Sequence, residues 1–204
     1  MGLIHRFIAI CFLCCTLVLA LSAHAADNLQ AQKQSSPVVR LSTDYGDIVL
    51  ALYPEKAPAT VENFLNYVNS YYYDGVIFHR VVRGFVIQAG GYGFDLYPRE
   101  PGAPVINESG NGLVNKPGSI AMARTSDPDS ARAQFFINLS HNKNLDATPT
   151  TPGYTVFGEV VEGMGVVRKI SQQPVKRAGI HQHLPRQPIM IQKARMDAHQ
   201  QADL

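Results

Sequence analysis

Short apolar runs that alternate with polar residues recur along the chain from Val38 onward, separated by turns rich in Gly, Pro, Asp and Asn. A period of two is typical of β-strands with one buried face. The first two runs flank residues 43–46 (TDYG), a turn signal that predicts a β-hairpin. The pattern predicts strands at residues 38–42, 47–53, 76–82, 85–89, 119–124, 134–139, 154–161 and 187–196.

Two segments change to the helical period. From Val61, apolar residues recur at i, i+3, i+4 and i+7, and Thr60 before them is a candidate N-cap. A second short helix is predicted over residues 163–171. This balance favours a mainly β fold, and we expect a compact antiparallel barrel or sandwich of about eight strands, since closure removes exposed strand edges. The two α-helices are then expected to cap its open ends.

The N-terminal residues have the three parts of a secretory signal peptide. Arg6 supplies the positive charge, residues 7–21 are largely apolar, and residues 23–25 (AHA) form a small-x-small cleavage site. The apolar run of about 15 residues is shorter than the ~20 that a membrane-spanning helix needs. We therefore expect a signal peptide at 1–25, a flexible leader at 26–37, one folded domain at 38–196 and a C-terminal tail at 197–204.

The composition excludes several classes of function. The chain has 18 Lys and Arg against 16 Asp and Glu, without the basic excess of most nucleic-acid-binding domains, so no nucleic acid partner is expected. All three cysteines lie inside the predicted signal peptide, so we expect no disulfide, thiol catalysis or zinc–thiolate site in the mature chain. Residues 181–183 (HQH) offer only two imidazoles and are interpreted as a surface loop, so no metal or cofactor is expected.

One arginine stands inside an apolar run. Strand alternation in residues 78–82 (FHRVV) places Phe78, Arg80 and Val82 on one face, and the same rule pairs Val86 with Gln88 and Gln134 with Phe136. An arginine on an apolar face is rare unless it is paired or used. The alternative is a surface strand whose solvent face carries Arg80 and Gln88.

These segments together closely resemble the cyclophilin family of peptidyl-prolyl cis-trans isomerases. The resemblance extends from about Val38 to Ala194, and with the predicted signal peptide it is similar to the periplasmic branch of bacterial cyclophilins. It implies the closed eight-stranded barrel capped by two helices. The segments that carry it are 73–91 (YDGVIFHRVVRGFVIQAGG), 118–124 (GSIAMAR), 133–137 (AQFFI) and 154–160 (YTVFGEV).

The resemblance also implies a site on the outer wall, with Arg80 as the catalytic residue. Val86 stands where methionine is common, Tyr154 where many members have histidine, and Asn144 where cyclosporin-sensitive members have tryptophan, so weak cyclosporin binding is expected. The positions that match the proline pocket are Phe85, Val86, Phe136, Leu145 and Tyr154, and those that match the substrate-backbone contacts are Gln88, Ala123, Arg124 and Gln134, beside Thr125.

The function that the resemblance implies is isomerisation of X-Pro bonds during the folding of exported proteins in the periplasm. The expected partners are proline-containing unfolded or partly folded polypeptides, and we expect a monomer without stable membrane association after signal cleavage. Two alternatives stay open: a periplasmic chaperone or peptide-binding module with incidental isomerase activity, and a small-ligand barrel of the lipocalin type. The second needs an empty interior, whereas the inward residues Phe135, Ile137 and Phe157 favour a filled core.

Overall fold

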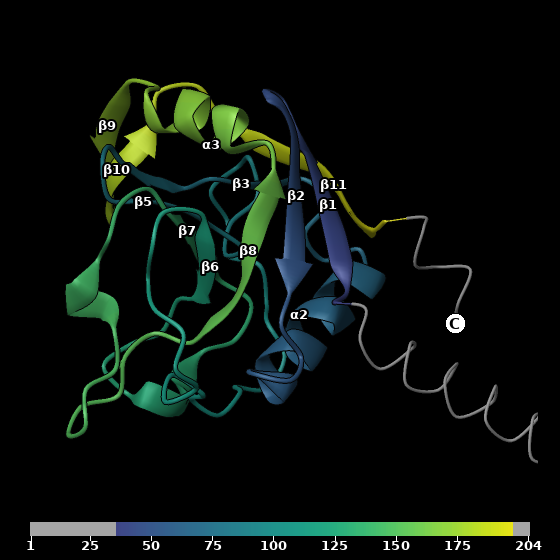
Figure 1. Ribbon diagram of the computed structural model, residues 1–204. Coiled ribbons are helices and arrows are strands. Elements are labelled where there is room, and N and C mark those ends of the chain that lie inside the picture. The colour runs from purple at the N-terminus through teal and green to yellow at the C-terminus, as the bar shows by residue number, and fades with distance from the viewer. Residues whose placement is uncertain (1–35, 198–204) are drawn as a thin grey trace, which may run out of the picture. The chain divides into compact units, whose positions relative to one another are not determined.

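The computed structural model describes residues 36–197. The predicted signal peptide at 1–25, most of the predicted leader at 26–37 and most of the predicted tail at 197–204 lie outside the described residues, so these three remain predictions. The described part of the chain contains a large curled sheet, a separate β-hairpin and two α-helices (Figure 1). None of its helices is long and apolar enough to span a bilayer.

Nine strands of the described residues form the large sheet, in the order β3-β11-β1-β2-β8-β6-β7-β5-β4. Every neighbouring pair is antiparallel. The strands are β1 (Val38–Thr43), β2 (Gly46–Leu52), β3 (Val76–Ile77), β4 (Arg80–Val82), β5 (Val86–Ala89), β6 (Ser119–Met122), β7 (Phe135–Asn138), β8 (Val156–Glu162) and β11 (Met190–Met196).

The prediction of a closed eight-stranded barrel is wrong, because the sheet is a curled half-barrel of nine strands. The predicted strand at 76–82 is divided into β3 and β4, with Phe78 and His79 between them. β3 pairs with β11 and β4 pairs with β5, so the two edge strands are consecutive pieces of one short segment. An unbroken strand at this segment would pair with both β11 and β5 and so join the two edges of the sheet. Because β3 and β4 are separate, the sheet stays open between them.

The interruption also reverses the side-chain phase. Val76 and Phe78 belong to the main core, as does Val81, whereas Arg80 is half-buried and faces outward. The expectation that Phe78 and Arg80 share a face is therefore wrong. A shift of one residue moves every following side chain of a strand to the opposite face, and here that shift removes Arg80 from the core.

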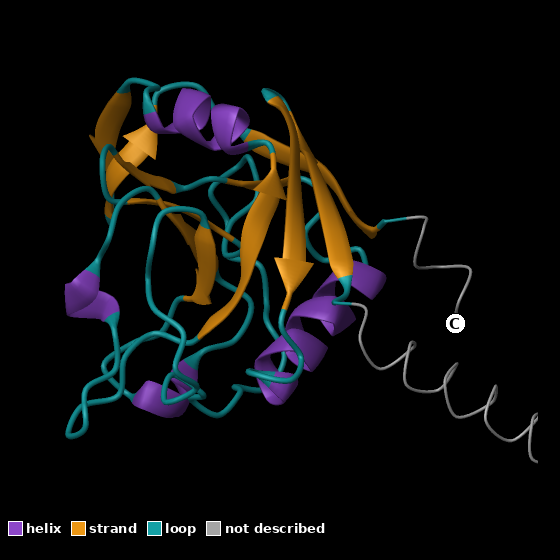
Figure 2. Cartoon of the chain, in the orientation of Figure 1, coloured by secondary structure: helices purple, strands orange, loops and turns teal. Residues whose placement is uncertain are grey.

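Two helices cover the sheet at different ends (Figure 2): α2 (Pro58–Asn69) and α3 (Met164–Ser171). Two short 3-10 helices, η1 (Pro128–Ser130) and η2 (Lys143–Leu145), interrupt the loops. The segment interpreted as a surface loop at 181–183 belongs instead to a hairpin of β9 (Val175–Ala178) and β10 (His181–Pro185). The sequence pattern did not indicate this hairpin, because its exposed strands lack regular apolar alternation.

The N-cap prediction for α2 is also wrong, because the helix begins earlier, with Ala57 as N-cap and Pro58 in the first turn. Thr60 lies inside this turn, where its N–H (2.9 Å) and its hydroxyl (2.7 Å) donate to the Glu108 carboxylate. The Ala59 N–H donates to the same carboxylate (3.1 Å). A side chain 48 residues away in sequence from Thr60 thus satisfies the free donors of the helix terminus.

Aromatic side chains fill the interior between α2 and the sheet. The Phe64 ring of α2 lies 5.2 Å from the rings of Tyr73 and Phe157 and 5.6 Å from that of Phe135. All four residues are fully buried, and the Tyr73 hydroxyl donates to the carbonyl of Ala133 (2.9 Å). This filled core confirms the inward placement of Phe135 and Phe157 and is not the empty interior that a small-ligand barrel requires.

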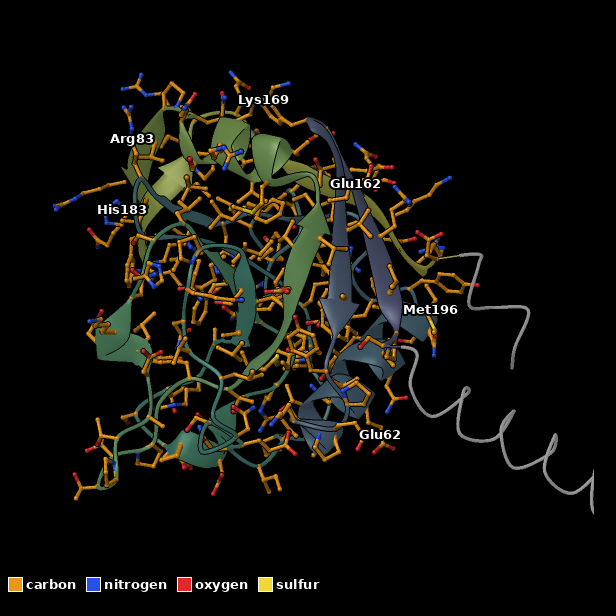
Figure 3. The ribbon with its side chains drawn as sticks, viewed as in Figure 1. Glu62, Arg83, Glu162, Lys169, His183 and Met196 are labelled. Atoms are coloured by element: carbon orange, nitrogen blue, oxygen red, sulfur yellow. The ribbon has the colours of Figure 1, made fainter. Side chains whose placement is uncertain are left out.

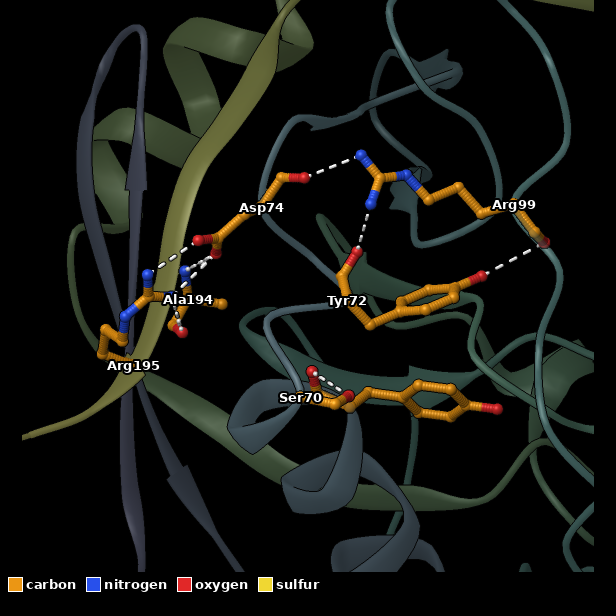
Figure 4. A network of polar contacts seen from close by, with 7 residues as sticks. Ser70, Tyr72, Asp74, Arg99, Ala194 and Arg195 are labelled. Atoms are coloured by element: carbon orange, nitrogen blue, oxygen red, sulfur yellow. Dashed lines mark hydrogen bonds and ion pairs between the residues drawn. The ribbon is translucent and has the colours of Figure 1, made fainter.

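A polar network ties the segment before β3 to β11 (Figure 4). The Asp74 carboxylate accepts hydrogen bonds from both terminal nitrogens of Arg195 (2.8 and 2.7 Å) and from the Ala194 N–H (3.1 Å). Arg99 donates to the carbonyls of Tyr72 (3.1 Å) and Asp74 (2.8 Å). These bonds attach the long glycine-rich loop to the sheet edge next to β3.

Replacement of Glu108 tests the remote cap. Because three donors of α2 lose their acceptor, we expect Glu108→Ala to lower the free energy of unfolding by about 2 kcal/mol in urea denaturation. Glu62→Ala, on the exposed face of the same helix, is the control and is expected to change it by less than about 0.5 kcal/mol. Equal losses in the two variants would contradict the capping role.

Candidate active site

A pocket of about 280 Å³ opens on the outer face of the curled sheet, away from the aromatic core. Nine of the ten site residues proposed from the sequence line it, and the tenth, Gln134, is hydrogen-bonded to one of them. The lining consists of Arg80, Phe85, Val86, Gln88, Ala123, Arg124, Phe136, Leu145 and Tyr154. The roles assigned to these residues by resemblance remain predictions.

The floor of the pocket is a second apolar cluster, separate from the core. Its buried members are Val86 on β5, Ala121 on β6, Phe136 on β7 and Val156 on β8, one from each of four strands. Phe85, Leu145 and Tyr154 are partly buried and pack against this cluster. Ala121 and Val156 are not among the predicted site residues, although strand alternation next to the core residues Ile120 and Phe157 indicates their outward position.

Arg80 stands at the edge of this floor. It lies opposite Gln88 in the β4–β5 register, and its Nη1 donates to Gln88 Oε1 (3.2 Å). Gln88 Nε2 in turn donates to Gln134 Oε1 (2.9 Å). Of the two glutamines, Gln88 contacts the arginine directly, and Gln134 holds Gln88 in place.

The guanidinium of Arg80 keeps most of its hydrogen-bonding capacity. Within the described residues Arg80 has no carboxylate partner, and its carbon Cζ lies 5.7 Å from the centre of the Phe85 ring. Burial lowers the pKa of Arg80, yet a guanidinium stays protonated at any physiological pH. The site therefore presents a positive charge with free N–H donors beside an apolar hollow.

The opposite wall is built by Arg124 and Tyr154. The Arg124 guanidinium donates to the carbonyls of Gly153 (3.2 Å), Pro152 (2.9 Å) and Thr125 (2.9 Å) and lies 4.6 Å from the centre of the Tyr154 ring. Since its nitrogens are engaged by backbone carbonyls, this guanidinium fixes the loop after η2. The fixed loop places Tyr154 edge-on to the Phe136 ring, 5.6 Å away.

The same loop needs a glycine at one position. A Cβ atom at Gly153 would collide with backbone atoms of Asp146 and Ala147. The close approach lets the Tyr154 N–H donate to the carbonyl of Leu145 (2.9 Å), which brings Leu145 to the pocket wall. Asn144 beside it is exposed, and weak cyclosporin binding remains a prediction.

Two further hollows adjoin the pocket. One of about 490 Å³ shares Gln88, Ala123 and Arg124 with it, and one of about 250 Å³ shares Arg80. Gln134 lines both of these neighbours. The three hollows thus meet at the Arg80–Gln88–Gln134 chain.

His79 lines the smaller neighbour and is almost completely buried. Its ring lies edge-on to Tyr92 (4.8 Å) and 5.9 Å from the ring of His181, and its Nδ1 has no hydrogen-bond partner. Burial lowers the pKa of His79 to about 4, and repulsion from His181 contributes to the shift. His79 is therefore neutral at physiological pH. Residues 36–197 contain no group of three side chains placed to hold a metal ion.

The outer face of the sheet thus carries an apolar pocket beside a guanidinium that Gln88 holds. Residues 38–196 match the family model for cyclophilin-type peptidyl-prolyl cis-trans isomerases. The chain belongs to the cyclophilin family and is a peptidyl-prolyl cis-trans isomerase.

Known relatives agree with this assignment. A peptidyl-prolyl cis-trans isomerase of Acinetobacter baylyi is 46% identical over 173 residues, covering 85% of this chain and 88% of the relative. Peptidyl-prolyl cis-trans isomerase A of Dickeya dadantii is 49% identical over 162 residues, covering 79% and 85%. A crystal structure of a Cryptosporidium parvum cyclophilin-type isomerase in the presence of the dipeptide Ala-Pro has a TM-score of 0.67 and 27% identity, covering 79% of this chain and 99% of that one.

The burial of neutral His79 predicts a specific loss of stability in acid. Its pKa in the folded state lies below the ordinary value near 6.5, so the unfolded chain binds the extra proton as pH falls through this window. The stability that depends on neutral His79 is fully present above about pH 6.5 and is lost as the pH falls toward 4. Relative to a His79→Phe variant, we expect the wild type to lose about 2–3 kcal/mol of unfolding free energy between pH 7 and pH 4.5.

Urea denaturation of both proteins at several pH values measures this difference. Comparing the change with pH, rather than absolute stability, removes any packing effect of the phenylalanine. Parallel pH profiles for the two proteins would show that His79 does not carry the effect.

Proposed function

We propose that this enzyme accelerates X-Pro isomerisation during the folding of exported proteins in the periplasm, with Arg80 as the catalytic residue. The observation that carries the catalytic part is the Arg80 guanidinium, which Gln88 holds beside an apolar pocket without a competing carboxylate. The periplasmic part is supported by the signal-peptide pattern of residues 1–25.

The reaction requires only that the barrier to rotation about the X-Pro bond be lowered. Amide resonance separates the cis and trans forms of an X-Pro bond by roughly 18–20 kcal/mol, although their free energies differ by only about 0.5–1 kcal/mol. In the twisted transition state the imide nitrogen regains its lone pair and becomes a hydrogen-bond acceptor. A donor directed at that nitrogen therefore stabilises the transition state more than either ground state, which raises the rate.

Arg80 has the properties that this role needs. Its charge persists at physiological pH, and its planar group presents donors in fixed directions, which a lysine ammonium does not. Gln88 holds one nitrogen of the group, and Gln134 holds Gln88. The orientation of the guanidinium is therefore set before substrate arrives, so little ordering is needed during the reaction.

The apolar floor provides the binding site for the proline ring. Val86 and Phe136 are buried at its base, and Phe85, Leu145 and Tyr154 form its walls. A ring seated there displaces water and lowers the local dielectric, which strengthens the interaction with Arg80. The related Cryptosporidium parvum enzyme crystallised in the presence of Ala-Pro supports a proline-containing ligand for this pocket.

Substitution of Arg80 tests the catalytic role. Loss of the donor is expected to reduce kcat/KM on an X-Pro peptide by roughly 100-fold or more in Arg80→Ala, and Arg80→Lys is expected to restore little of it. Arg168→Ala on α3, which removes an exposed arginine that lines none of the three hollows, is the matched control and should retain activity.

Circular dichroism and thermal unfolding establish that the variants are folded. Full activity in a folded Arg80→Ala protein would refute the catalytic role. Rescue of client refolding by the inactive variant, at wild-type yield, would favour the chaperone alternative.

A further inference from the structure

The lining of the site is one-sided in charge. The three hollows that meet at the Arg80–Gln88–Gln134 chain are lined by four arginines and by no aspartate or glutamate. The four are Arg80, Arg99, Arg124 and Arg132. Arg99 and Arg124 donate to backbone carbonyls, which do not neutralise them.

The C-terminal part of the domain increases this bias. Residues 163–196 contain seven Lys and Arg and no acidic residue, whereas residues 36–162 contain nine Lys and Arg against 13 Asp and Glu. The near-neutral net charge of the chain therefore combines a negatively charged part, residues 36–162, with a positively charged part, residues 163–196. The smaller hollow beside Arg80 is lined on one side by Ile180, His181 and Gln182 from the positively charged part.

Three exposed cations lie on or next to the elements that adjoin this smaller hollow, and we call them the basic rim: Arg83, Lys176 and Arg177. Arg83 directly follows β4, which packs against β10, and the other two belong to β9 of the same hairpin. None of the three has an ion-pair or hydrogen-bond partner through its side chain within residues 36–197. Figure 3 shows Arg83 and His183 at this end of the molecule, with Glu62 at the other.

The larger hollow shares Gln88, Ala123 and Arg124 with the proline pocket, and it combines arginines with nearby carboxylates. Thr125 and Ser130 line it, and both are hydrogen-bonded to the segment that carries the exposed carboxylates Asp127 and Asp129. A polypeptide held in the proline pocket can extend over either neighbour. A flank over the larger hollow meets arginines together with the nearby carboxylates, whereas a flank over the smaller hollow lies near the unpaired cations of the basic rim.

We propose that this isomerase prefers X-Pro segments that carry an acidic side chain on the flank lying beneath the β9–β10 hairpin. The inference rests on the proposed function and names the substrate class of the same site. The cations of the basic rim are free to pair with such a carboxylate, and the absence of acidic residues in residues 163–196 prevents competition from within that segment. Complementary fields raise the rate of encounter as well as affinity, so the preference is expected in kcat/KM.

All peptides in the experiment share one X-Pro bond. Each carries Glu, Gln or Lys at a single flanking position, either before or after the X-Pro pair. We expect Glu to exceed Lys in kcat/KM by about 3–5-fold on one flank only, as for exposed ion pairs. The difference is expected to disappear near 1 M salt, where the Debye length is about 3 Å.

Charge reversal of the rim locates the effect. In Lys176→Glu/Arg177→Glu the Glu-to-Lys ratio on that flank should fall to one or below. Lys56→Glu/Lys193→Glu makes the same change in net charge at two exposed positions outside the three hollows and should preserve the wild-type ratio.

Each other outcome is decisive. Equal rates for Glu and Lys peptides, the same preference on both flanks, or equal losses in the two double variants would overturn the inference. If the wild type fails to isomerise even the Gln peptides, the proposed function itself fails, which is a distinguishable result.

Discussion

The buried core fixes the phase of the strands that form the pocket floor. Ile87, Phe135 and Phe157 are fully buried on the inner face of the sheet. Because side chains alternate along a strand, the positions next to them, Val86, Phe136 and Val156, must point outward. The pocket floor is therefore the reverse side of the core. A change that slips one strand by a single residue would exchange a core side chain for a pocket side chain, so the site depends on the same packing that stabilises the fold.

Arg80 escapes this rule only because its strand is interrupted. In an unbroken strand Arg80 would share the face of Val76 and Phe78, both of which belong to the core. At the interruption the Phe78 N–H donates to the carbonyl of Ile189 (2.9 Å), so the chain is held by backbone bonds although it leaves the regular ladder. This local irregularity places the charge of Arg80 on the outer face. Regular strand geometry would have placed it in the core, where an unpaired ion is very costly.

Sequence periodicity could predict most strands, both helices and the grouping of Gln88 with Val86 because these depend on neighbours along the chain. It could not predict the division at Phe78–His79, which depends on pairing with β11 and β5 at once. Nor could it predict that Glu108 caps α2, since that contact joins residues far apart in sequence. Periodicity could not separate the contacts of Gln88 from those of Gln134, because these contacts depend on side-chain geometry that strand alternation does not determine. The site residues themselves came from family resemblance more than from spacing.

The chain of Arg80, Gln88 and Gln134 has a consequence for the conditions under which such a pocket can operate. Amides do not titrate in water near neutral pH, and a guanidinium does not lose its proton there. The chemistry of the pocket is consequently indifferent to proton activity over a wide range, unlike an enzyme that relies on an acid–base pair. In acid, the burial of neutral His79 lowers the stability of the fold instead. Such separation would suit the proposed location in the periplasm, where the acidity follows the surroundings of the cell.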